Sequence, residues 1–280
     1  MAQAETFERL RTATIERIPD ATDFAVNRSA STKKVAFVLS LAAGVGASLL
    51  WNADAYSSTT LTAIMIPMAV AGGLLSTWSP CGYSSICLLR PNGRWSVGSV
   101  AAWTPTLLAH LAGYILGAVV LGGVLGLAGK LLGLNHLIGF GLPVLALLMI
   151  VYGAHQFDFL RVPYPQRRCQ VPHDARQRFR KWVIGLLYGF SLGLNYLTYV
   201  QTPLLYAVTA AALFSGSPVF AIGIFLAFNA GRFAPVMLNA LPISDARITA
   251  WLARHQQNAA FVDGMLLVGI GALITGLVVL

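Results

Sequence analysis

Residues 71–89, AGGLLSTWSPCGYSSICLL, begin as an apolar helix and are interrupted near the middle by Ser79, Pro80 and Cys81. Proline removes a backbone hydrogen bond and clashes with the preceding turn, which costs about 3 kcal/mol inside a helix. In a lipid bilayer the carbonyl groups that the interruption frees need partners within the protein or in a water-filled cavity. The stretch therefore predicts a broken membrane helix, and the rest of the chain decides whether the break is a packing feature or a site.

The composition is typical of a membrane protein with many spans. Of the 280 residues, 56% are hydrophobic and only 10% are charged, whereas soluble domains carry about 25% charged residues. The three cysteines, Cys81, Cys87 and Cys169, are too few for a secreted fold held together by disulfides. Residues 1–34 are polar and contain neither the apolar core nor the cleavage site of a signal peptide, so we expect a cytoplasmic leader there.

Seven apolar runs follow the leader, and each is about as long as the ~20 residues that a helix needs to cross a bilayer. They are residues 35–51, 61–89, 101–129, 137–154, 182–214, 219–241 and 261–280. The second and fifth runs are longer than a straight span requires, and each carries an internal proline, Pro80 in one and Pro203 in the other. The sequence therefore predicts an all-α integral membrane protein of seven transmembrane helices, two of them broken or kinked.

The positive charges predict the orientation of these spans. Of the 19 lysines and arginines, 17 lie in residues 1–34, 90–100, 155–181 and 242–260, and the alternate loops are nearly free of them. Cytoplasmic loops of membrane proteins carry such an excess. We therefore expect a cytoplasmic amino terminus and, after seven spans, a periplasmic carboxyl terminus. This arrangement also accounts for the net charge of +9 without a nucleic-acid partner.

The last six spans contain signs of an internal repeat. Residues 108–113 read LAHLAG and residues 226–231 read LAFNAG, so four of the six positions are identical. One span earlier in each half, Ser-Pro-Cys at 79–81 corresponds to Thr-Pro-Leu at 202–204. Three spans are an odd number, so the second copy must be inverted relative to the first. Inverted repeats with paired broken helices are typical of alternating-access transporters, whose sites lie where the breaks meet.

The predicted organisation follows from this repeat. The leader is followed by an extra span with its periplasmic loop, a first three-helix repeat, a basic cytoplasmic loop and a second, inverted three-helix repeat. The corresponding boundaries are 1–34, 35–60, 61–154, 155–181 and 182–280.

Both breaks, together with Gly-Arg-Phe-Ala-Pro at 231–235, resemble the thiol-reductant transporters of the CcdA and DsbD transmembrane family of cytochrome c biogenesis. The resemblance covers residues 61–280. The stretches SPCGYSSICLLRPNGRW and QTPLLY are similar to the branch of that family linked to methylamine utilisation.

This resemblance implies a specific activity and set of partners. Members of the family pass electrons across the bacterial inner membrane by thiol–disulfide exchange, using one cysteine in each break. The implied donor is a cytoplasmic thioredoxin, and the implied acceptor is a periplasmic thioredoxin-like protein. The methylamine branch implies a role in the maturation of periplasmic methylamine dehydrogenase, together with other methylamine-utilisation maturation proteins.

The chain departs from the family pattern at the second break, because Cys81 occupies the first cysteine position but Leu204 stands at the second. Release of a mixed disulfide needs a resolving thiol, and Cys87 is the nearest candidate. In a continuous helix Cys87 would lie about 9 Å along the axis from Cys81, and a disulfide requires Cα atoms within about 7 Å. Only an unwound segment would allow that bond. The positions that correspond directly are Ser79, Pro80, Cys81, Thr202 and Pro203.

Other polar residues in the apolar runs are candidates for the site. Gly82 lies beside the first break, and Asn195 and Gln201 precede the second, where amide groups can satisfy freed carbonyls. Arg232 lies within the sixth span, and an intramembrane arginine usually faces a cavity or a partner. His110 has no ligand partner at helical spacing, so we interpret it as a core histidine. We expect neither a metal nor a cofactor.

Three functions remain open at this stage. The first is a membrane maturation factor that moves reducing equivalents or a related solute to the periplasm. The second is a transporter of a small solute or metal without redox chemistry, which the leucine at position 204 favours. The third is a non-transporting assembly scaffold. The sequence has no GxxxxGK[ST], GxSxG or HExxH motif, so an enzyme with a nucleotide or hydrolytic site is not expected.

Overall fold

The computed structural model describes residues 28–51, 53–79, 81–82, 85–86, 89–91, 95–163 and 179–279. Regular structure in these ranges is entirely helical, which confirms the all-α class. Pro80, Cys87 and Cys169 were singled out above and lie outside the described residues. The elements are α2 (Ala30–Leu50), α3 (Ser58–Leu75), η1 (Ser76–Trp78), α5 (Val97–Leu131), η2 (Leu134–Leu137), α6 (Ile138–Gln156), α8 (Lys181–Gly193), α9 (Leu204–Ser215), α10 (Pro218–Phe233), η3 (Ala234–Ala240) and α11 (Asp245–Val279).

Within the described ranges, six helical stretches are long and apolar enough to cross a membrane. They are α2, α3 with η1, α5, η2 with α6, α10 with η3, and α11, and they match six of the seven apolar runs. The remaining run, 182–214, forms the two short helices α8 and α9, which are separated by residues 194–203. The count of seven spans therefore stays a prediction.

The first predicted break begins before the proline. Helix α3 ends at Leu75, the chain tightens into the 3₁₀ turn η1, and Ser79 is extended with φ −77° and ψ 152°. Two hydroxyl groups take up carbonyls that the helix releases: Ser76 Oγ donates to the Gly73 carbonyl at 2.6 Å, and Ser79 Oγ donates to the Ser76 carbonyl at 2.5 Å. The serines therefore satisfy the backbone at the place where the helix stops.

The second break also differs in position from the one that Pro203 predicts. Helix α8 ends at Gly193, and Asn195 adopts a left-handed conformation with φ 55° that turns the chain out of the helix. Pro203 is the residue that caps the start of α9 rather than a kink inside a helix. A proline is well tolerated at a helix start, because no intrahelical hydrogen bond requires its missing N–H there.

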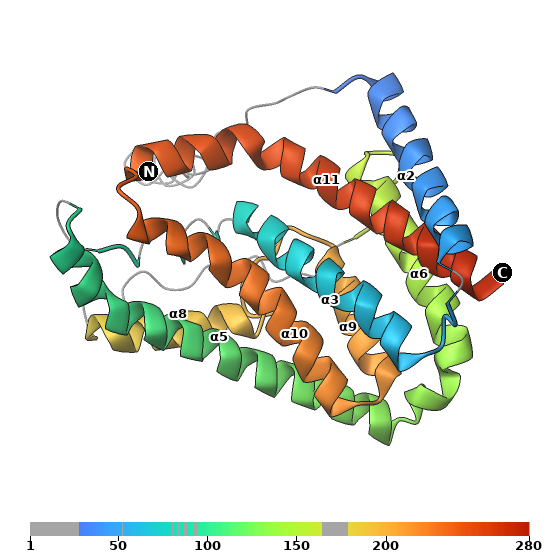
Figure 1. Cartoon of the computed structure of the whole chain (residues 1–280), viewed down its shortest axis with the longest axis horizontal. Helices are drawn as coiled ribbons and strands as arrows, with labels where there is room; N and C mark the ends of the chain where they lie inside the picture. The colour runs from blue at the N-terminus through green and yellow to red at the C-terminus, as the bar shows by residue number, and fades with distance from the viewer. Residues whose placement is uncertain are drawn as a thin grey trace, which may run out of the picture.

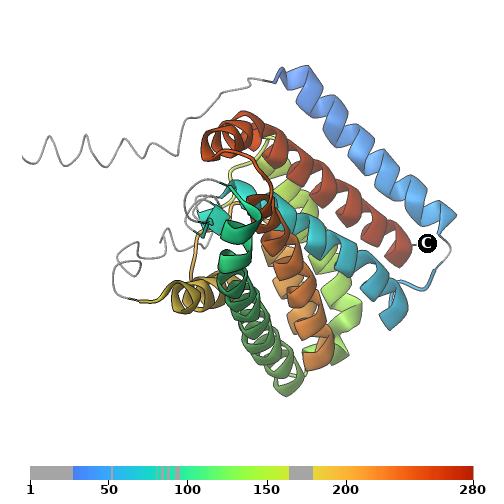
Figure 2. The same cartoon turned by 60° about the vertical axis from the view of Figure 1, so that its left-hand side comes forward.

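The helices form one bundle with α2 on its outside (Figures 1 and 2). Helix α5 lies between α8 and α10, α10 also crosses α3, and α11 packs on both α6 and α2. The buried face of α2 consists of small residues at every fourth position, Ala36, Ser40, Gly44 and Ser48. Small residues allow membrane helices to approach closely, and the opposite face of α2 exposes large apolar side chains suited to lipid.

Two helix crossings in the bundle are built alike. A methyl group on Gly113 of α5 or on Gly189 of α8 would collide with the backbone of the other helix. At the second crossing, a methyl group on Gly231 of α10 or on Gly73 of α3 would likewise collide with the backbone of the other helix. Gly113 and Gly231 are the final residues of the LAHLAG and LAFNAG segments. Matched residues thus make matched contacts, as an internal repeat predicts.

Candidate functional site at the two helix breaks

Cys81 lies at the first break and is buried, with 2% of its surface exposed. Its apolar neighbours come from three helices: Tyr114 from α5, Leu192 from α8 and Phe233 from α10. Gly82 follows it against the backbone of Thr77, where an added methyl group would collide. The glycine therefore lets the chain fold back closely beside the thiol.

Arg232 reaches from α10 to the end of α8. Its Nη1 donates to the Leu192 carbonyl at 2.9 Å and to Asn195 Oδ1 at 3.0 Å, and its Nη2 donates to Thr198 Oγ1 at 3.2 Å. The side chain is 3% exposed, so it lies in the interior instead of extending to the membrane surface. A cation at the carboxyl end of a helix is favourable, because the last carbonyl groups of the helix carry partial negative charge.

Two asparagines complete this end of α8. Asn195 Nδ2 donates to the Gly193 carbonyl at 3.0 Å and to Asn229 Oδ1 at 3.1 Å. Asn229 Nδ2 in turn donates to the carbonyls of Gly193 and Tyr114, each at 3.0 Å. Side chains of α10 and Asn195 in the break therefore both donate to the freed carbonyls at the end of α8. The amide of Asn229 also bonds to α5, so it links α5 to this helix end.

His110 in α5 takes part in the first break, although the sequence indicated only a core histidine. Its Nδ1 is 3.0 Å from the Gly185 carbonyl, and its Nε2 is 3.1 Å from Ser85 Oγ. The carbonyl can only accept, so Nδ1 carries the proton and Nε2 accepts from the serine hydroxyl. The ring also meets Tyr114 edge-on, with centroids 4.9 Å apart. His110 thus joins α8 to the segment that follows Cys81.

Two polar groups in this region have no hydrogen-bond partner among the residues that the structure describes. They are the Tyr114 hydroxyl and the Nε of Arg232, and both are buried. The Tyr114 hydroxyl faces Ser85 without the geometry of a full hydrogen bond, and it lies within electrostatic range of Arg232 and Cys81. Buried polar groups are normally hydrogen-bonded, so unpartnered ones call for an explanation. Here Tyr114 packs in the same cluster as Cys81.

Leu204 does not face Cys81. It is fully buried in the main apolar core, where its side chain packs against Gly72 of α3, whereas Cys81 belongs to a separate cluster. Thr202 accepts a hydrogen bond from the Leu204 N–H at 3.2 Å and donates to Asp263 Oδ1 at 2.5 Å. The structure therefore does not bring the two motif positions that correspond to the family cysteines into one apolar cluster.

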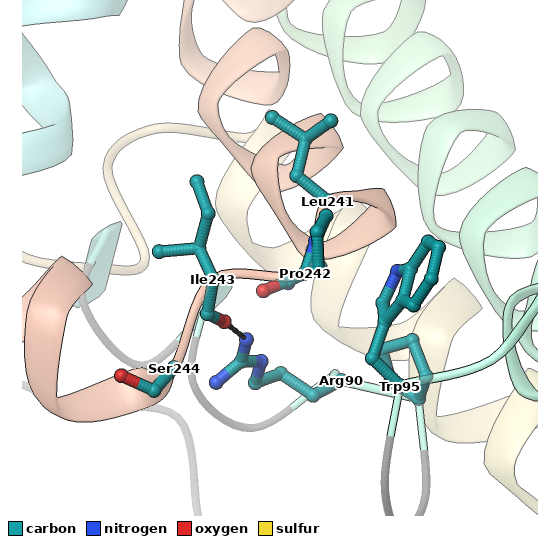
Figure 3. A pocket seen from close by; sticks show the side chains of 8 residues that line it. Arg90, Trp95, Leu241, Pro242, Ile243 and Ser244 are labelled. Atoms are coloured by element: carbon teal, nitrogen blue, oxygen red, sulfur yellow. Dashed lines mark hydrogen bonds between the residues drawn. The ribbon is translucent and has the colours of Figure 1, made fainter.

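An open pocket of about 450 Å³ lies where the chain after the first break meets the start of α11 (Figure 3). Arg90 donates to the Ile243 carbonyl, and Trp95 Nε1 donates to the Ala240 carbonyl at 2.9 Å. Asn239 also lines this pocket; it donates to the Ile86 carbonyl at 2.8 Å while its Oδ1 is buried without a partner. These bonds hold the first half of the chain to the second, in loops that the charge pattern assigns to the cytoplasmic side.

Comparison with known proteins finds relatives that match nearly the whole chain. Methylamine utilization protein MauF of Paracoccus denitrificans is 58% identical over 255 residues, which are 91% of this chain and 91% of that protein. The proteins of the same name from Methylobacillus flagellatus and Methylorubrum extorquens are 51% and 52% identical and cover 94% and 92% of this chain, and 93% and 90% of their own length. The chain belongs to the MauF family.

Matches of this length take in both helix breaks, so the MauF relatives align across the whole candidate site. No family model matches the chain, and no solved structure is similar to it. The resemblance to CcdA and DsbD therefore rests on the sequence motifs at the two breaks and at residues 231–235.

Sequence reasoning missed several residues that the structure places at the breaks. Tyr114, Ser85 and Asn229 carried no spacing signal, because their partners lie far away in the chain. Asp263 had a signal that was overlooked: it is the one acidic residue in the apolar run 261–280, and intramembrane carboxylates usually have a role.

Proposed function

We propose that this protein acts in methylamine utilisation as a membrane maturation factor for periplasmic methylamine dehydrogenase. The assignment to methylamine utilisation is supported by its MauF relatives, whose names include methylamine utilization. The six apolar helices support a multi-pass membrane location. We assign it to the bacterial inner membrane with a cytoplasmic amino terminus and a periplasmic carboxyl terminus, because the lysines and arginines lie in alternate loops.

We further propose that Cys81 is the thiol through which the protein works. The observation that carries this proposal is its position: a buried cysteine at a helix break, where the ends of α8 and α10 meet α5. Its thiolate attacks the disulfide of a periplasmic thioredoxin-like acceptor and forms a mixed disulfide, which frees one acceptor thiol.

Completion of the exchange needs a second thiol. A thiolate of a cytoplasmic thioredoxin attacks the Cys81 sulfur and releases the acceptor as a dithiol. The second thioredoxin thiol then restores Cys81 and leaves thioredoxin as the disulfide. Two electrons and two protons pass from donor to acceptor. In a variant of this route, Cys87 takes the resolving role within the chain.

A thiol that is 2% exposed must be uncovered before it can meet a protein partner. The contacts that close the site are the hydrogen bonds that Arg232 donates to the end of α8 and the one that Ser85 Oγ donates to His110 Nε2. Because the Arg232 bonds join α10 to the end of α8, we propose that movement of α8 relative to α10 exposes Cys81.

A second candidate is transport of a solute without redox chemistry. The observation that favours it is Leu204, which stands at the second cysteine position and is packed in the apolar core. In this case Cys81 acts only as a small apolar side chain, and replacement by serine has little effect on function.

Maturation in cells distinguishes the two candidates. We expect Cys81→Ser to reduce active methylamine dehydrogenase strongly while the membrane protein is still produced. Cys169→Ser is the matched control and should leave maturation unchanged, because the loop 155–181 lies away from both breaks in the sequence. The measurement is dehydrogenase activity per cell, with immunoblots of both proteins. Equal activity in the Cys81→Ser strain and the wild-type strain would exclude thiol chemistry at this site.

A further inference from the structure

Asp263 is a buried carboxylate in α11 that the thiol chemistry does not use. It is 2% exposed, and both its oxygens accept hydrogen bonds from neighbouring elements. Thr202, which precedes α9, donates to Oδ1 at 2.5 Å, and Nε2 of Gln156 at the end of α6 donates to Oδ2 at 2.7 Å. Both donors are neutral, and no charged group acts on Asp263 from within the described part of the chain.

An ionised carboxylate in this position needs a positive charge. Removing such a group from water costs several kcal/mol even after the protein relaxes, and hydrogen bonds to a charged group return only about 1.5–3 kcal/mol each. These hydrogen bonds orient the carboxylate, and a counter-ion would complete its neutralisation.

A small cavity adjoins the carboxylate. It has a volume of about 10 Å³ and is lined by Asp263, Thr202, Gln156, Gln201 and Gln256 together with apolar residues. This is the size of about one water molecule. The Oε1 of Gln201 is buried there without a hydrogen-bond partner. Carboxylate, hydroxyl and amide oxygens therefore surround one small space beside the second helix break.

We propose that Asp263, Thr202 and Gln201 bind a small monovalent metal cation of the sodium class. Hard cations prefer oxygen ligands of these types, and one carboxylate matches one positive charge. A divalent ion such as calcium takes 6–8 oxygen ligands, which a space of this size does not offer. Unwound segments next to half-helices hold the coupling ions of many transporters. The site does not depend on Cys81, so it stands whether or not the thiol exchanges.

Sodium binding to the purified full-length protein in detergent tests the proposal directly. We expect saturable binding of ²²Na⁺ and a rise of the thermal unfolding midpoint in sodium chloride over choline chloride at equal ionic strength. Protons compete for the same carboxylate, so binding should weaken as pH falls. The residues that line the cavity from η1, α3, α6, α11 and the 201–202 segment include no other titratable side chain, so this competition reports on Asp263.

Three variants separate a cation site from a structural role. Asp263→Asn keeps the shape but removes the charge and should abolish saturable binding. Gln201→Leu leaves the carboxylate and its two donors in place and should weaken binding by about tenfold, which corresponds to 1.4 kcal/mol. Asp158→Asn is the matched control and should bind like wild type, because Asp158 is exposed and pairs with Lys33.

The wild-type protein keeps the proposal falsifiable even if Asp263→Asn does not fold. Absence of saturable sodium binding to wild type, or binding that Gln201→Leu leaves unchanged, overturns it. A midpoint that responds equally to sodium and choline would mean that the cavity holds only water, and this result also overturns the proposal.

Discussion

At the scale of single residues, Arg232 of α10 acts as a C-cap for α8, because it donates to a carbonyl at the end of that helix. Its guanidinium group reaches the Leu192 carbonyl and two side chains in the turn beyond α8. The planar fork of arginine suits such divided contacts better than the single nitrogen of lysine. Arg232 therefore fixes where α8 ends and how α8 lies against α10, next to Cys81.

Replacement of Arg232 by methionine should destabilise the protein. The change leaves Asn195 Oδ1 without a donor, and an unsatisfied buried group costs about 1–3 kcal/mol. We expect the thermal unfolding midpoint, followed by tryptophan fluorescence in detergent, to fall by roughly 2–12 °C, since 1 kcal/mol shifts it by about 2–4 °C in a chain of this size. The exposed Arg247→Met should change it little. Equal midpoints for both variants would show that Arg232 does not hold the break.

The residue scale also shows what spacing cannot predict. The Ser-Pro-Cys segment indicated a break, and the serines do satisfy freed carbonyls there. The environment of Cys81 depends instead on Tyr114 and Phe233, which approach it only through tertiary packing. The periodicity of a sequence does not predict such contacts.

At the scale of helices, the prolines did not predict the residues at which the broken helices end. Helix α3 stops at Leu75, before Pro80, and α8 stops at Gly193, well before Pro203. Asn195, with its left-handed backbone, is the residue that ends α8 locally. Its side chain is held by Asn229 and Arg232, so this helix end is set by contacts between helices and not by local sequence alone.

Close crossings of helices should be sensitive to single methyl groups. In α10, Gly231 lies against the backbone of α3, whereas Gly223 faces open space. Gly231→Ala should therefore destabilise the protein by about 1–3 kcal/mol, as overpacking does. Gly223→Ala is the control in the same helix and should be neutral or slightly stabilising, because alanine favours the helix. Unfolding midpoints of the two variants provide the test, and a neutral Gly231→Ala would argue against the close crossing.

At the scale of the whole molecule, the length of the apolar runs predicted most of the fold, and the orientation that the charges indicate stays a prediction. Six of the seven apolar runs appear as helices that can span a membrane. The extra first span is also present, as α2 on the outside of the bundle (Figure 2). The internal repeat, indicated by four identities in six positions, stays a prediction; the matched glycines Gly113 and Gly231 both lie at close helix crossings.

What the sequence could not provide was the relation between the two breaks. Matching Thr202, Pro203 and Leu204 to the first motif suggested one shared site. The structure instead shows two neighbourhoods: Cys81 near Tyr114 and Arg232, and Thr202 near Asp263. We propose thiol exchange at the first neighbourhood and cation binding at the second.

The central claim is that Cys81 exchanges disulfides with a protein partner. The most direct measurement uses cells producing a variant in which Cys81 is the only cysteine (Cys87→Ser, Cys169→Ser), quenched in acid and alkylated before non-reducing electrophoresis. Loss of any internal resolving thiol should prolong a mixed disulfide. The account predicts a heavier species that reductant removes and that is absent when Cys81 is also replaced by serine. A Cys81 thiol that stays fully reduced and forms no such species, in cells that still mature methylamine dehydrogenase, would contradict it.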